Sequence, residues 1–228
     1  MTAPDLKPDL KLHAIPDWAS VIIRFALEEM AVPHTLVKKD FDAGDLDSPV
    51  YRAINPLGLI PAMETPNGPM FETAAILLWL TDRHGSLAPG PQDADRAAFL
   101  SWLFFTSNAL HPAAMALIYP DRPAGEAAAA AAIAVAHEQV RARLGLVEAM
   151  IAAKHPRWLS ATEPGVLGYY IGTLVRWMTM LPPAPHAITL TAFPALHAVL
   201  AAHEARPAAL RVALADGLGP TPFTNPVS

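Results

Sequence analysis

Two neighbouring stretches decide the fold of this chain: Asn55-Pro56-Leu57-Gly58-Leu59-Ile60-Pro61-Ala62-Met63 and Phe71-Glu72-Thr73-Ala74-Ala75. Pro61 lacks a backbone N–H where a strand is about to begin, and X-Pro is the peptide bond for which cis is least costly. We therefore expect a sharply bent loop with unpaired backbone groups that can pair with a peptide-like ligand. Glu72 lies eleven residues further on and opens a helix, whose first N–H groups favour an anion. The combination indicates a small zwitterionic peptide as ligand.

The composition excludes several classes of protein. The chain has 228 residues, of which 53% are hydrophobic and 16% charged, which is typical of a well-packed globular protein. A formal net charge of −5 argues against a nucleic-acid binder, and the absence of cysteine excludes disulfides and CxxC redox chemistry. The spacing of the nine histidines favours no metal site. The N-terminus lacks signal-peptide features and no apolar run reaches membrane-spanning length, so we expect a soluble cytoplasmic protein without a membrane partner.

Hydrophobic periodicity predicts a mixed α/β half followed by an all-α half. In the first half we expect strands at residues 10–15 and 34–37, a hairpin at 62–71 around Asn67-Gly68, and helices at 21–30 and 73–84, with residues 40–49 as a loop. Gly85 is expected as a left-handed helix C-cap. Residues 87–92 mark a linker, after which we expect helices at 94–119, 126–154, 166–180, 193–206 and 208–215. His111-Pro112 predicts a kink in the first of these.

The order and spacing of these motifs resemble the glutathione S-transferase family, over nearly the whole chain. The resemblance implies a thioredoxin-like glutathione-binding domain at residues 1–86 and a C-terminal helical bundle domain at 93–228. It also implies glutathione as co-substrate and a homodimer in which residues 63–75 face the partner subunit. Residues 11–16 look most like the bacterial beta class, but His13 stands in place of its tyrosine and Ala19 in place of its cysteine.

The resemblance implies roles for four residues of the two stretches and for one serine outside them. The backbone of Ile60, before Pro61, would pair with the cysteinyl part of glutathione. Glu72 would accept from the γ-glutamyl ammonium, while Thr73 would bind its carboxylate. Ser20, at the start of the first helix, would donate to the sulfur and act as the catalytic residue. Helix starts also attract serine as a cap, so a purely structural Ser20 is the alternative.

The second substrate is expected to lie against the first helix of the all-α half. Its pocket is expected to include one residue near the sulfur and five from that helix: Trp18, Trp102, Phe105, Asn108, His111 and Tyr119. An aromatic stripe at helical spacing is equally typical of an ordinary core. The substrate would be an electrophilic, largely apolar small molecule.

Two departures from the family pattern leave alternatives open. Leu59 stands where many members carry Lys or Gln toward the glycine carboxylate of glutathione. Gly165 and Gly168 replace the Ser and Asp of the family's helix-start box, and a lost cap costs about 0.5–2 kcal/mol. The alternatives to a transferase are a non-catalytic protein that binds glutathione or another small molecule, and a fold retained for protein interaction.

Overall fold

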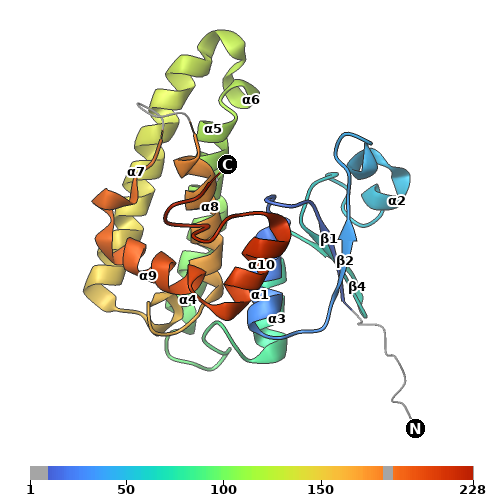
Figure 1. Ribbon diagram of the computed structural model, residues 1–228, viewed down its shortest axis with the longest axis horizontal. Helices are drawn as coiled ribbons and strands as arrows, with labels where there is room; N and C mark the ends of the chain where they lie inside the picture. Colours follow the sequence, from blue (N-terminus) through green and yellow to red (C-terminus); the bar gives the residue numbers. More distant parts are fainter. Residues whose placement is uncertain (1–9, 182–186, 228) are drawn as a thin grey trace.

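The computed structural model describes residues 10–181 and 187–227, and these form a sheet-containing half and a helical half (Figure 1). The N-terminal elements are β1 (Lys11–Ala14), α1 (Ser20–Glu29), β2 (Thr35–Lys38), α2 (Pro49–Arg52), β3 (Ala62–Thr65), β4 (Gly68–Phe71) and α3 (Thr73–His84). The sheet has the strand order β2-β1-β3-β4, with β1 parallel to β2 and antiparallel to β3. This βαβ–ββα arrangement confirms the predicted thioredoxin-like half.

The two faces of the sheet are covered by different helices. Leu12 and Met63, which face each other across β1 and β3, are both fully buried in the core shared with α1 and α3. Tyr51 of α2 belongs to a smaller cluster on the other face, with Ala62 of β3. In Figure 1, α1 and α3 lie on the side of the sheet toward the helical half, and α2 lies on the far side. Successive residues of a strand point to opposite faces, which produces this division.

The prediction of a simple loop at residues 40–49 is wrong at Asp45–Asp47, which form a 3-10 turn, and the helix α2, which begins at Pro49, was not predicted. Pro49 is the first residue of this helix, where its missing N–H costs nothing, and the Ser48 hydroxyl accepts from the backbone N–H of Tyr51 at 3.2 Å. A four-residue helix is too short to show periodicity. In the sequence, Ser48 as a possible N-cap and Pro49 as a possible first residue were the signals that indicated this helix.

The helical half begins after residues 85–95, where Gly85 adopts the expected left-handed conformation with φ 62°. Its helices are α4 (Arg96–Phe105), α5 (His111–Ile118), α6 (Asp121–Ala124), α7 (Ala129–Lys154), α8 (Val166–Thr179), α9 (Pro194–Glu204) and α10 (Pro207–Asp216). A π-helical turn, Thr106–Leu110, separates α4 from α5 directly before Pro112. The predicted break in the long helix is therefore present, and its form is a π-helical turn.

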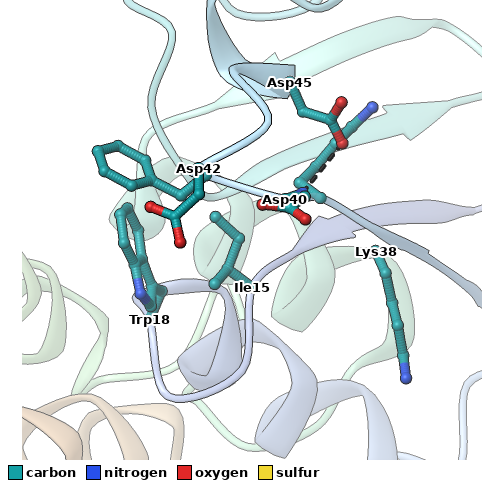
Figure 2. A pocket seen from close by; sticks show the side chains of 8 residues that line it. Ile15, Trp18, Lys38, Asp40, Asp42 and Asp45 are labelled. Carbon is teal, nitrogen blue, oxygen red and sulfur yellow. Dashed lines mark hydrogen bonds between the residues drawn. The ribbon is translucent and has the colours of Figure 1, made fainter.

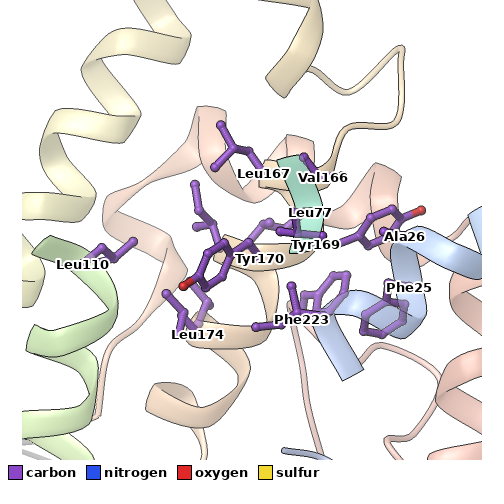
Figure 3. Packing of buried hydrophobic residues seen from close by; sticks show 14 of the residues in the cluster. Phe25, Ala26, Leu77, Leu110, Val166, Leu167, Tyr169, Tyr170, Leu174 and Phe223 are labelled. Carbon is purple, nitrogen blue, oxygen red and sulfur yellow. The ribbon is translucent and has the colours of Figure 1, made fainter. Parts of the chain in front are cut away.

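The helix α8 runs through the middle of the core. Tyr169 and Tyr170 are both essentially unexposed, and Figure 3 shows their rings pointing in opposite directions, toward Phe25 of α1 and toward Leu110. The Tyr169 ring stacks on Phe25 with centroids 5.2 Å apart, and its hydroxyl donates to Glu29 at 2.6 Å. This helix therefore connects the two halves of the molecule.

A histidine from α9 replaces the cap that the sequence lacks at the start of α8. His203, which is 1% exposed, accepts from the Gly165 N–H through Nε2 at 3.0 Å, and its Nδ1 donates to the Val199 carbonyl at 2.9 Å. An ideal Cβ on Gly168 would lie only 2.2 Å from that Nε2. The N-cap residue Gly165 makes no side-chain capping hydrogen bond, as the sequence predicted, but the two glycines make room for a side chain from a distant helix, which accepts from the Gly165 N–H.

Candidate functional site

The loop before β3 contains a cis peptide bond between Ile60 and Pro61. The Leu59 carbonyl fixes this loop, because it accepts two hydrogen bonds of 2.7 Å, one from the Tyr51 hydroxyl and one from the Asn55 side-chain amide. Gly58 turns the chain with φ 65°, close against α2. Burial raises the pKa of Tyr51 to about 12, so its hydroxyl keeps its proton and remains a donor. The predicted bent loop is confirmed, and Tyr51 is a supporting residue that sequence analysis missed.

The start of α3 carries backbone strain next to this loop. Glu72 has φ 75° and ψ 118°, a conformation that residues with a side chain rarely adopt, and its side chain makes no capping hydrogen bond. Strained residues of this kind persist where surrounding structure imposes them, and they concentrate at binding sites. Thr73, the first residue of the helix, is 6% exposed. The first-turn N–H groups of a twelve-residue helix therefore have no side-chain acceptor at the N-cap.

Ser20 is the sequence-predicted site residue that the structure places differently from expectation. Its side chain is 1% exposed, its hydroxyl donates to the Ile15 carbonyl at 3.0 Å, and the same oxygen accepts from the Ile15 N–H at 3.2 Å. A hydroxyl has one proton, and here that proton is used inside the protein. In this arrangement Ser20 fixes the turn between β1 and α1 and has no proton free for a ligand.

An open cavity of about 570 Å³ lies beside the same turn. Its walls include Ile15 and Trp18 from the turn, together with Lys39, Phe41 and Asp42 from the segment after β2. Trp18 and Phe41 pack with ring centroids 5.1 Å apart, and Figure 2 shows Trp18, Ile15 and Asp42 gathered around one space. Of the residues predicted for the second-substrate pocket, Trp18 is the one that lines this cavity.

The predicted pocket residue His111 lies at the junction of α5 with α8. His111 Nδ1 lies 2.8 Å from the Tyr170 hydroxyl, and its ring is 6.3 Å from that of Trp177. Burial lowers the pKa of His111 to about 4, so the ring is neutral at pH 7. Burial and the nearby carboxylate of Glu72 both raise the pKa of Tyr170. His111 is therefore a neutral, buried ring paired with a protonated tyrosine of α8.

The remaining predicted pocket residues do not form one cluster. Trp102 packs on Phe105 with centroids 5.0 Å apart, and both side chains are half-buried. Asn108 is exposed on the π-helical turn and accepts from the Ser107 hydroxyl at 2.9 Å. Tyr119 lies just beyond α5, where the guanidinium of Arg122 sits 3.7 Å from its ring centroid.

His13 occupies the position of the beta-class tyrosine but is enclosed by protein. It is 3% exposed, its Nε2 lies 3.0 Å from a Glu64 carboxylate oxygen, and its ring meets Tyr51 edge-on at 5.4 Å. Burial lowers its pKa, partly opposed by the hydrogen bond to Glu64. Within the described residues its Nδ1 has no hydrogen-bond partner. The side chain thus lies under α2 and is not open to a ligand.

Comparison with known proteins shows similarity to one family. Residues 20–83 match the family model of the glutathione S-transferase N-terminal domain. Glutathione S-transferase 3 of Zea mays is 29% identical over 222 residues, covering 95% of this chain and 98% of that protein. The chain is therefore similar to glutathione S-transferases over nearly its whole length, and residues 20–83 match their N-terminal domain. The beta-class glutathione S-transferase of Sphingomonas chungbukensis superposes with a TM-score of 0.72 at 26% identity, covering 92% of this chain and all of that one.

A second similar structure was solved with its ligand bound. The glutathione transferase of Burkholderia graminis, solved with two glutathione molecules bound per subunit, is 26% identical with a TM-score of 0.75, and the match covers 92% of this chain and 89% of that one. In residues 10–181 and 187–227 of the present protein, no helix is long and apolar enough to span a membrane.

Proposed function

We propose that this protein binds glutathione and activates its thiol for attack on an electrophilic, largely apolar second substrate. The observation that carries the proposal is the bent loop at Ile60–Pro61, which lies beside the start of α3 because Ala62 pairs with Phe71, and there Glu72 has a positive φ. Bent backbone offers peptide-like pairing, and an uncapped helix start offers N–H groups to an anion. A γ-linked tripeptide has an extended backbone for the bent loop, a free carboxylate for the helix start and a free ammonium for Glu72.

Each part of glutathione has a partner in this proposal. The backbone of Ile60 pairs with the cysteinyl residue. The Thr73 hydroxyl and the first N–H groups of α3 bind the γ-glutamyl carboxylate, and Glu72 accepts from its ammonium. Leu59 is 55% exposed and apolar, so the glycine carboxylate needs another cation. We assign Lys39, which lines the cavity beside Trp18 and whose ammonium lies 5.4 Å from the Tyr51 ring centroid.

We propose that the sulfur of glutathione lies at the start of α1. Because the Ser20 hydroxyl is bonded to Ile15, we assign thiolate stabilisation to the first-turn N–H groups of α1, which no side chain caps. A helix N-terminus lowers the pKa of a nearby thiol. The thiol proton passes to solvent, the thiolate forms a C–S bond to the electrophile, and a leaving group departs with its electron pair. Holding both reactants in place supplies the rest of the rate increase.

The second substrate is proposed to lie between the turn carrying Trp18 and the α4–α5 region. Trp102, Phe105 and His111 supply apolar and aromatic surface there. The partner in the cell is thus a small-molecule electrophile, and the assembly is proposed to be a homodimer. Phe71 of β4 is 37% exposed at the sheet edge, in the segment expected to face the second subunit.

Isothermal titration calorimetry with glutathione tests the proposal. Thr73→Ala and Glu72→Gln each remove one contact of the γ-glutamyl group, and each is expected to weaken binding about 10- to 100-fold, since a hydrogen bond to a charged group contributes about 1.5–3 kcal/mol. Thr191→Ala, the same change at an exposed threonine before α9, is the control and should bind like the wild type. Equal affinities for all four proteins would contradict the site.

A non-catalytic glutathione-binding protein is the second candidate. The commitment of the Ser20 hydroxyl to Ile15, together with the absence of cysteine, favours it. The thiol pKa of bound glutathione separates the two candidates, and thiolate absorbance measured against pH gives it. A value below that of free glutathione supports catalysis, whereas an unchanged value supports binding alone.

A further inference from the structure

The turn between β1 and α1 contains a strained residue that is not glycine. Asp17 has φ 56°, in the left-handed region where a Cβ is crowded by the backbone. Asp tolerates this region better than most residues, but it still persists there only when other contacts hold it. The contacts that hold Asp17 come from α8, on the other half of the molecule.

Two neighbouring residues of α8 bind Asp17 on both its backbone and its side chain. Trp177 donates from Nε1 to the Asp17 carbonyl and to a carboxylate oxygen, each at 3.0 Å. The Arg176 guanidinium donates to the same carboxylate from Nε at 2.9 Å and from Nη2 at 2.9 Å. A bidentate guanidinium–carboxylate pair fixes direction as well as distance.

Arg176 is itself held rigidly. It is 2% exposed, and its Nη1 donates to the Leu218 carbonyl at 2.9 Å, in the segment after α10. A buried charge has to be paired, so the carboxylate of Asp17 cannot leave without a large cost. The turn is therefore tied to α8 and, through Arg176, to the C-terminal segment.

The turn carries the groups that the proposed chemistry uses. Trp18, the next residue, forms a wall of the cavity and packs against Phe41. The Trp18 carbonyl accepts from the Val21 N–H at 2.8 Å, which joins the turn directly to the first turn of α1. A shift of Asp17 would therefore move both the cavity wall and the N–H groups assigned to the sulfur.

We propose that Asp17 is a positioning residue that, held by Trp177 and Arg176, fixes Trp18 and the start of α1 relative to the sulfur of bound glutathione. This inference rests on the proposed function. It assigns to the helical half a part in thiol activation through contacts that do not touch glutathione. A simple tether between the two halves would use the same contacts but would leave the thiol chemistry unaffected.

Trp177→Phe is the main test, since it removes the N–H donor and changes no charge. With glutathione and 1-chloro-2,4-dinitrobenzene as probes, we expect turnover to fall about tenfold to a hundredfold while the KM for glutathione stays within about threefold, because small misplacements cost rate more than binding. The thiol pKa of bound glutathione should move toward that of the free tripeptide.

Two variants at position 17 complete the test. Asp17→Gly relieves the strained φ but deletes the carboxylate, so its turnover should fall as in Trp177→Phe even if its thermal stability is kept. Asp17→Asn tolerates the same φ and still accepts from Trp177, so it should recover part of the lost turnover. Glu163→Gln changes an exposed carboxylate paired with Arg157 and is the control with wild-type behaviour.

The outcomes distinguish this inference from the function on which it rests. A wild-type protein that does not lower the thiol pKa of glutathione overturns both. A wild-type protein that lowers it, with Trp177→Phe and Asp17→Gly lowering it equally and turning over at the wild-type rate, overturns the positioning role alone. A fall in melting temperature without any change in turnover or thiol pKa would identify a simple tether and would also overturn it.

Discussion

Gly168→Ala is expected to destabilise this protein, although Gly→Ala in a helix interior is ordinarily stabilising. The change improves helix propensity by about 0.8–1 kcal/mol. Against this, the new Cβ would lie 2.2 Å from His203 Nε2 and 2.4 Å from its Cδ2, both far inside contact distance. The imidazole must therefore leave its place in the core.

The displaced ring loses two hydrogen bonds, one with the Gly165 N–H at 3.0 Å and one with the Val199 carbonyl at 2.9 Å. Leaving a buried donor unsatisfied costs about 1–3 kcal/mol, and overpacking a core costs about 1–3 kcal/mol. After the propensity gain is subtracted, the net loss in free energy of unfolding should be about 1–5 kcal/mol.

Urea denaturation followed by circular dichroism measures this change. Gly145→Ala, within α7, is the matched control, because its Cβ would meet nothing within 4 Å and it should stabilise by about 0.8–1 kcal/mol. The double variant Gly168→Ala/His203→Ala relieves the clash and should be more stable than Gly168→Ala alone. If Gly168→Ala stabilises the protein as Gly145→Ala does, the account of His203 as a cap is wrong.

Three further predictions concern the site. The pKa of His111 is lowered to about 4 from 6.5, so its contribution to stability is complete above pH 6.5 and falls by about 3 kcal/mol as the pH drops to 4. Urea midpoints measured against pH should show this loss, and His111→Gln should make the stability depend less on pH. Ser20→Ala should lower the free energy of unfolding by about 1–3 kcal/mol, because it unpairs the Ile15 N–H and carbonyl. The rate of conjugation per folded molecule should stay within about threefold of the wild type. A loss of turnover at full stability would show that Ser20 is the thiolate donor after all. Tyr51→Phe removes one of two donors to the Leu59 carbonyl and should weaken glutathione binding about two- to tenfold by calorimetry, whereas unchanged affinity would show that Asn55 alone fixes the loop.

Local sequence signals predicted most of the fold. Periodicity and turn residues located the strands and the long helices to within a few residues, because each of these signals acts on its own segment. The left-handed C-cap at Gly85 and the hairpin turn at Asn67-Gly68 were likewise predicted from local residues. The helix α2 was missed because four residues are too few to show a period, and it is held by packing of Tyr51 under the sheet.

The residues of the site were harder to interpret, since their roles depend on partners far away in sequence. Nothing local shows that His203 fills the space left by Gly168, or that Asp17 is bound by Trp177. The Ser20 hydroxyl looks free in the sequence, and only the folded turn shows that Ile15 uses it. The order of Pro61, Glu72 and Thr73 identified the candidate site because these residues lie close together along the chain.

Crystals soaked with glutathione test the central claim most directly. The account predicts density for the tripeptide along Ile60 and Pro61, with the γ-glutamyl carboxylate at Thr73, its ammonium at Glu72, and the sulfur within hydrogen-bond distance of the first-turn N–H groups of α1. An empty loop at saturating glutathione, or a tripeptide bound with its sulfur away from α1, would contradict it.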